Sequence, residues 1–151
     1  MKKLKIISLL LFLWLPVSVW ALEYPTLHYD KAILYDLTDD KVLYELKDTE
    51  RAHVASLTKI LTTITAIESI NNLDDMITYT ENMKSLVRWD ASVAGLSVGD
   101  KISYRDLLYA SILPSGADAT TALAISTSGS ISNFVKKMNE EASKIGMSNS
   151  H

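Results

Sequence analysis

The spacing of apolar residues changes along the chain, and each change predicts a different element. Residues 31–36 and 41–46 are short runs rich in Ile, Val, Leu and Tyr, separated by turn formers at 37–40. This arrangement predicts a β-hairpin. From residue 55 to residue 70 the apolar positions fall three or four apart, which predicts a helix that two asparagines at 71–72 would end. Its inward face would hold Leu57, Ile60, Leu61, Ile64 and Ile67.

The middle of the chain predicts loops and then a capped helix. Residues 74–102 show short elements without a sustained period, punctuated by glycines. Ser103 and Asp106 then form a capping-box pattern that opens a helix. That helix should run through Leu113, because Pro114 cannot continue it.

Two more helices are predicted near the C-terminus. The first runs from about residue 118 to residue 125, and the second from about 131 to 145, with Gly146 suited to its C-terminal cap. A hairpin followed by a cluster of helices predicts an α+β fold. The inward residues of the last helix would be Phe134, Val135, Met138 and Ile145.

Residues 1–21 show the three parts of a secretory signal peptide. Three lysines in the first five residues precede an apolar run over 6–15, and Pro16 breaks the segment. Val19 and Ala21 supply small residues three and one before a cleavage site. An uncleaved membrane anchor is the alternative, but Pro16 and the cleavage site favour removal. We therefore expect an exported protein, in the periplasm or at the outer face of the cytoplasmic membrane and the cell wall.

Composition narrows the classes of function. The chain has 151 residues, 48% hydrophobic and 22% charged, with no cysteine. This argues for one domain and excludes thiolate zinc sites, cysteine nucleophiles and disulfides. Removal of residues 1–21 takes three lysines and no acids, so the net charge of residues 22–151 is −6 rather than −3. Such a chain has no electrostatic footprint for nucleic acid. His28 and His53 are too scattered to predict a metal site, and no cofactor is expected.

Ser56 and Lys59, at the start of the first predicted helix, are the main candidates for chemistry. Side chains three apart on a helix lie on neighbouring rows, so the hydroxyl and the amine can meet. The next charged residue is Glu68, so we expect the amine to be desolvated and able to accept a proton from a serine nucleophile. The alternative is that Ser56 caps the helix and Lys59 extends to water. The spacing by itself favours this alternative.

Several segments together resemble the serine D-alanyl-D-alanine carboxypeptidases, which belong to the penicillin-binding proteins and share the fold of serine β-lactamases. The resemblance covers nearly all of residues 22–151, in the family's order and approximate spacing. It implies an α+β, DD-peptidase-like fold, in which an antiparallel sheet accompanies a helical subdomain. The segments that carry it are residues 51–62, 95–100, 106–109, 113–119, 138–142 and 145–147.

The resemblance also implies roles for three residues. Ser56 would be the acylated nucleophile and Lys59 its proton acceptor, while Ser115 would begin the family's S-x-N motif and pass a proton to the leaving group. Peptidoglycan stem peptides would lose their terminal D-alanine, and β-lactams would be covalent inhibitors. Ala117 departs from the motif, because its methyl group cannot make the hydrogen bonds of the usual Asn. Without the family, Ser115 and Gly116 would be assigned to a turn after the proline that caps the next helix.

The family's third motif, Lys-Thr-Gly, does not occur in the sequence. In the family that strand supplies an oxyanion N–H and a cation for the substrate carboxylate. We therefore interpret residues 22–151 as the N-terminal part of a catalytic domain, truncated before the C-terminal sheet strands. We expect this fragment by itself to be inactive, and the resemblance allows peripheral membrane association in a full-length form.

Three other functions are compatible with parts of the sequence. A serine β-lactamase-like hydrolase is the nearest enzyme alternative, although no Glu-x-x-Leu-Asn-like segment is present. Ala117 and the missing third motif favour a catalytically impaired cell-wall-binding protein on the same scaffold. Residues 95–99 match the G-x-S-x-G elbow of esterases, but the preceding residues make a poor buried strand and a turn follows. The esterase interpretation is therefore disfavoured.

Overall fold

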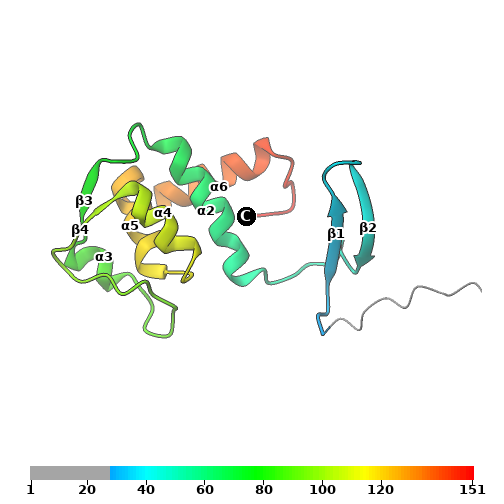
Figure 1. Ribbon diagram of the computed structural model, residues 1–151, viewed down its shortest axis with the longest axis horizontal. Coiled ribbons are helices and arrows are strands. Elements are labelled where there is room, and N and C mark those ends of the chain that lie inside the picture. The colour runs from blue at the N-terminus through cyan, green and yellow to red at the C-terminus, as the bar shows by residue number, and fades with distance from the viewer. Residues whose placement is uncertain (1–27) are drawn as a thin grey trace, which may run out of the picture. The chain divides into compact units, whose positions relative to one another are not determined.

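The computed structural model describes residues 28–151. These residues form two compact units, which meet along the chain between Ala52 and His53. The predicted signal peptide lies outside the described residues. Within residues 28–151, none of the helices has the length and apolar character needed to cross a membrane. Figure 1 shows the elements of both units.

The first unit contains the predicted hairpin. Strands β1 (Ala32–Asp36) and β2 (Lys41–Leu46) pair antiparallel, with an irregularity in register within β1. The Asp36 carboxylate accepts the backbone N–H groups of Thr38 at 2.8 Å and Asp39 at 3.3 Å, which closes the turn. The predicted hairpin is confirmed.

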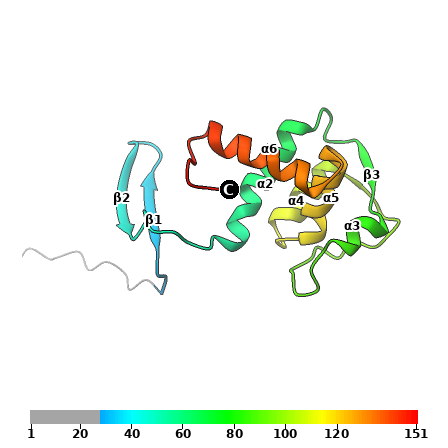
Figure 2. The ribbon, with the colours of Figure 1, turned by 180° about the vertical axis from the view of Figure 1, so that it is seen from behind.

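The second unit is mainly helical, with one short β-ribbon. In Figures 1 and 2 the ribbon lies at the opposite end of this unit from the start of α2. Together with the hairpin, these elements confirm the α+β class. They are, in chain order, the 3₁₀ turn η1 (Ala55–Leu57), α2 (Thr58–Ser69), β3 (Met76–Thr78), α3 (Glu81–Ser85), β4 (Lys101–Ser103), α4 (Tyr104–Ile112), α5 (Ala117–Ser128) and α6 (Ile131–Lys144).

Helix α5 is the centre of this unit and contacts α2, α3, α4 and α6. It is longer than the predicted 118–125 and has no single apolar stripe, because most of its circumference is covered. Small residues let the neighbouring helices approach closely. Its buried residues are Asp118, Ala119, Thr121, Ala122, Leu123 and Ala124.

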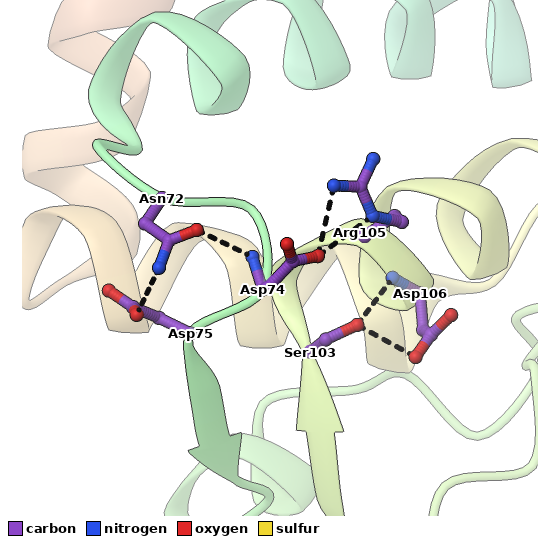
Figure 3. A network of polar contacts seen from close by, with 6 residues as sticks. All are labelled: Asn72, Asp74, Asp75, Ser103, Arg105 and Asp106. Atoms are coloured by element: carbon purple, nitrogen blue, oxygen red, sulfur yellow. Dashed lines mark hydrogen bonds and ion pairs between the residues drawn. The ribbon is translucent and has the colours of Figure 1, made fainter.

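Polar contacts tie the start of α4 to the loop after α2 (Figure 3). Asp106 donates its backbone N–H to the Ser103 hydroxyl at 3.0 Å, as the predicted capping box requires. Arg105 Nε donates to Asp74 Oδ1 at 2.9 Å, and the Asp74 N–H donates to Asn72 Oδ1 at 3.1 Å. The predicted boundaries of α4 are therefore confirmed to within one residue.

The predicted inward face of α2 is wrong. The helix buries Thr62, Thr65 and Ala66, whereas four of the five predicted apolar residues are 38–65% exposed. The two threonine hydroxyls donate to carbonyls one turn back, at 3.2 and 2.8 Å, so they can be buried without loss of hydrogen bonds. Helix α2 contacts α4, α5 and α6. The Thr62 hydroxyl on this buried face lies 3.9 Å from the Met138 sulfur of α6. The exposed apolar residues are Leu57, Ile60, Ile64 and Ile67.

The predicted inward face of α6 is half right. Phe134 is buried and Met138 packs against the core, but Val135 and Ile145 are exposed. Ala142 is buried in their place, because the contact with the core follows the row of residues that begins at Phe134. The predicted cap is confirmed, since Gly146 has a left-handed φ of 85° just after the helix.

Candidate active site

Three side chains predicted from the sequence meet at one point. Lys59 Nζ donates to Ser56 Oγ at 3.5 Å, at the long end of the hydrogen-bond range. Ser115 Oγ donates to Ser56 Oγ at 2.9 Å, although the two serines are 59 residues apart in the chain. The Ser56 hydroxyl thus lies between an amine and a second hydroxyl. An arrangement of this kind can move a proton away from the central oxygen.

Neither serine acts as a helix cap. Val54 is the N-cap of η1, Leu57 the N-cap of α2 and Gly116 the N-cap of α5, and none of the three makes a side-chain capping bond. The capping alternative for Ser56 is therefore wrong. The turn predicted for Ser115 and Gly116 does lead into α5, with Gly116 rather than Ser115 at the N-cap. Ser56 is exposed, while Lys59 and Ser115 are half-buried.

Two residues of this region have an unfavourable backbone conformation. Ala55, just before the candidate nucleophile, has a φ of 45°, and Ser115 has a φ of 58°. Each costs on the order of 1 kcal/mol for a residue that carries a side chain. Contacts with neighbouring residues must compensate for this cost.

Asp118, in the first turn of α5, is the functional candidate that the sequence analysis missed. It is 3% exposed, and its carboxylate accepts four backbone N–H groups. Ala94 and Ala119 donate to Oδ1 at 2.8 and 2.9 Å, and Gly95 and Leu96 each donate to Oδ2 at 2.9 Å. Two features of the sequence pointed to Asp118, its position in the first turn of a predicted helix and its place in the family-like segment 113–119, but neither assigned it a contact.

Burial by itself raises the pKa of the Asp118 carboxyl, but the four N–H groups outweigh this effect. The pKa of Asp118 therefore lies below its ordinary value, and the group is ionised near neutral pH. Ordered N–H dipoles stabilise this buried charge, as they stabilise anions at helix N-termini.

The residues on either side of Asp118 are also fixed. The Ala117 N–H donates to the Ser92 carbonyl at 2.8 Å, and the Gly116 N–H donates to the Ala110 carbonyl at 3.1 Å. A side chain at Gly116 would lie 2.6 Å from the Ala110 oxygen and 3.0 Å from Ala94 Cβ, so only glycine fits there. The Ala117 methyl group, where the family usually has Asn, offers no hydrogen bond.

The G-x-S-x-G segment does not have the geometry of a nucleophile elbow. Gly95 and Gly99 lie in turns, with φ of 94° and 97°. In the described chain no strand directly precedes Gly95, and β4 rather than a helix follows Gly99. The esterase interpretation is thus excluded on geometry.

An open apolar hollow of the second unit lies apart from the three candidate side chains. It has a volume of about 350 Å³ and lies between α2 and α4, and its lining includes Thr63, Ile67, Leu108 and Ile112 but none of the three candidates. Among residues 28–151, no three His, Asp or Glu side chains are grouped so that they could hold a metal ion.

The sequence profile of the D-alanyl-D-alanine carboxypeptidase family, peptidase S11, matches residues 19–151. The chain belongs to this family. It is 33% identical over 122 residues to the D-alanyl-D-alanine carboxypeptidase DacF of Bacillus subtilis, covering 78% of this chain and 31% of that protein. It is 34% identical over 152 residues to DacC of Escherichia coli, covering 94% of this chain and 38% of that protein.

Solved structures agree with this membership. The Streptomyces K15 DD-transpeptidase superimposes with a TM-score of 0.77 at 33% identity, over 85% of this chain and 52% of that one. Penicillin-binding protein 5 of Haemophilus influenzae gives 0.73 at 30% identity, over 83% and 38%. These matches confirm the predicted DD-peptidase-like fold. The chain spans about a third of the length of the curated relatives it matches.

Proposed function

We propose that this protein is an exported serine D-alanyl-D-alanine carboxypeptidase, which removes the terminal D-alanine from peptidoglycan stem peptides. The observation that carries the proposal is the position of Ser56 Oγ, 3.5 Å from Lys59 Nζ and 2.9 Å from Ser115 Oγ. The relatives named as D-alanyl-D-alanine carboxypeptidases support the reaction class. The signal-peptide pattern of residues 1–21 supports export to the periplasm or the outer face of the cytoplasmic membrane.

The first chemical step forms an ester. Lys59 Nζ accepts the Ser56 proton as Oγ attacks the carbonyl carbon of the penultimate D-alanine. The C–N bond to the terminal residue then breaks, and a proton passes through the Ser115 hydroxyl to the leaving amine. Ser56 now carries an acyl group, and free D-alanine departs.

The second step removes that acyl group. Water adds to the ester carbonyl and gives up a proton, and Ser56 Oγ leaves and regains its own. The start of a helix favours the negative oxygen that develops in both steps, because backbone N–H groups point outward there. A β-lactam would form the same ester without a leaving group that diffuses away, which accounts for the covalent inhibition we propose. Peripheral membrane association in a longer form is part of the proposal as well.

A second candidate function is a catalytically impaired cell-wall-binding protein. One observation favours it: Ala117 offers a methyl group where the family usually offers an amide to the lysine and the substrate. Such a protein would bind stem peptides without forming an ester.

Covalent labelling by a fluorescent penicillin tests the proposal. The label would be applied to the chain itself and to a fusion that joins it, in register, to the remaining half of the Streptomyces K15 enzyme. We expect the fusion to carry one penicillin on Ser56, and the variant Ser56→Ala to carry none. Ser97→Ala, at the esterase-like serine, is the matched control and should label fully.

The outcomes separate the functions. A label that persists in Ser56→Ala contradicts the proposed nucleophile. Absence of label from both the chain and the fusion, with stem peptide still bound, favours the impaired binding protein. Rapid release of hydrolysed penicillin would instead identify a β-lactamase-like hydrolase. Ser115→Ala should slow labelling on the order of a hundredfold, as expected for loss of a proton-transfer group.

A further inference from the structure

The turn that carries Ser115 is held by a chain of contacts that begins at a buried carboxylate. Asp118 is 3% exposed, and its two oxygens accept the N–H groups of three consecutive residues, 94–96. No ion pair involves Asp118 among the described residues. The buried charge is therefore stabilised by the backbone of a loop that is distant in the sequence. These hydrogen bonds hold the loop and the start of α5 together.

The same loop fixes the backbone next to Ser115. Ser92, two residues before the clamped segment, accepts the Ala117 N–H at 2.8 Å. The Ala94 methyl group lies where it would be 3.0 Å from a side chain at Gly116. The residue that follows Ser115 is thus closed in by the loop that Asp118 holds.

Ser115 itself needs this support. Its φ of 58° is unfavourable for serine, and in this conformation its hydroxyl lies 2.9 Å from Ser56 Oγ. A free turn would relax to a negative φ and rotate the side chain away. On the N-terminal side Ser115 makes one long backbone hydrogen bond, 3.3 Å to the Ile112 carbonyl, whereas the backbone on its C-terminal side is bonded at Gly116 and Ala117.

We propose that Asp118 is a positioning residue of this site: its carboxylate clamps residues 94–96 onto the start of α5 and thereby holds the Ser115 hydroxyl against Ser56. The effect on catalysis rests on the proposed function, whereas the geometric role does not. A purely structural role would stabilise the fold equally but would leave the distance between the two serines unchanged.

The absence of cysteine from the chain allows a direct test of that distance. In the double variant S56C/S115C, two thiols replace hydroxyls whose oxygens are 2.9 Å apart, so a disulfide can form with small adjustments. The added substitution Asp118→Asn keeps the shape of the side chain. Each carboxylate oxygen accepts two N–H groups, so the amide nitrogen must face two donors in either orientation.

We expect Asp118→Asn to slow disulfide formation on the order of tenfold or more, because the partner is displaced from its position. Glu141→Gln is the matched control, since Glu141 is the other buried carboxylate of the described chain and pairs with Lys144 on α6. It should leave the rate unchanged. Disulfide formation at the parent rate in a helical Asp118→Asn variant would overturn the proposal.

A measurement on the unsubstituted chain covers the case in which Asp118→Asn does not fold. The Ala117 amide bonds the Ser92 carbonyl of the loop. If one clamp holds both segments, the amides of residues 94–96 and of Ala117 should open together and show the same hydrogen-exchange protection. Free exchange at 94–96 with protection retained at Ala117 would contradict the clamp.

Neither the rate of disulfide formation nor hydrogen exchange depends on enzyme activity. The proposed function and the proposed positioning role of Asp118 can therefore fail separately. If penicillin never labels Ser56 but disulfide formation depends on Asp118, the proposed function fails and the positioning role stands. If Ser56 is labelled and Asp118→Asn changes neither the disulfide rate nor the labelling rate, the positioning role fails and the proposed function stands.

Discussion

The starts of α2 and α5 each present a serine to the candidate site, but the protein holds them in different ways. Around Ser115, Gly116 and Asp118 are buried and the loop 92–96 is bonded to the backbone. Around Ser56, every residue from 53 to 58 is exposed. Only the bonds to Lys59 and Ser115 restrain the Ser56 hydroxyl among the described side chains.

This difference shows how the position of a hydroxyl is encoded. The α5 half of the site, meaning Ser115 and the residues around it, is fixed by buried hydrogen bonds. Loss of such a bond leaves an unpaired polar group in the interior, which is energetically costly. The α2 half is fixed mainly by local chain geometry, because η1 runs directly into α2 and places Ser56 and Lys59 three residues apart. Substitutions in the α5 half should thus disturb the protein more than substitutions in the α2 half.

The largest effect is expected for Asp118→Ala. Four backbone N–H groups would lose their acceptor within a buried region, which should lower the free energy of unfolding by about 3 kcal/mol or more. Urea unfolding measures this change. Asp90→Ala removes an exposed carboxylate that pairs with Arg88, and it should barely shift the midpoint. Equal shifts for both variants would remove the contrast between buried and exposed carboxylates.

Gly116→Ala should have the next largest effect. The new methyl group would lie 2.6 Å from the Ala110 carbonyl oxygen, a backbone atom that cannot easily move, so we expect a loss of about 1–3 kcal/mol. Gly146→Ala is the control: it has open space, but its φ of 85° should still cost about 1 kcal/mol. A milder loss at Gly116 than at Gly146 would show that the α5 half is less tightly packed than it looks.

Ser115→Gly should separate stability from function. Glycine tolerates a φ of 58°, so thermal unfolding should show a gain of about 1 kcal/mol. The same variant loses the hydroxyl beside Ser56, so penicillin labelling should fall steeply. Ala55→Gly provides the comparison in the α2 half, where a similar gain is expected with labelling retained. Destabilisation by Ser115→Gly would mean that the Ser56–Ser115 hydrogen bond outweighs the backbone strain.

The smallest effect is expected on the exposed side of α2. Ile60 is 54% exposed, so Ile60→Ala should cost about 1 kcal/mol or less. Leu123→Ala, in the fully buried part of α5, should cost about 2–5 kcal/mol in the same urea experiment. Similar losses for the two variants would indicate that Ile60 is packed in solution.

Local patterns predicted much of this molecule. The hairpin, the capping box at Ser103 and the glycine cap after α6 depend on residues a few positions apart, and all three are confirmed. The pairing of Ser56 with Lys59 is of the same kind, because helical spacing alone brings them together.

The wrong prediction of the buried face of α2 has a physical cause. The isoleucines of α2 follow a helical period, which predicts that they face the core. Which face of a helix is buried, however, depends on which neighbouring helices or strands pack against it. Here α4, α5 and α6 contact α2, and the residues they bury are Thr62, Thr65 and Ala66 instead. Periodicity states that a helix has an apolar side, and it does not state what covers that side.

The sequence by itself determined the hairpin and the four longer helices, which family the chain resembles, and that a serine and a lysine lie three residues apart at one helix start. Only the tertiary structure brought Ser115 to Ser56 across 59 residues, and only it gave Asp118 its four N–H donors from two segments of the chain. Contacts over such separations depend on how the loops close and the helices pack. No local pattern of residues encodes that geometry.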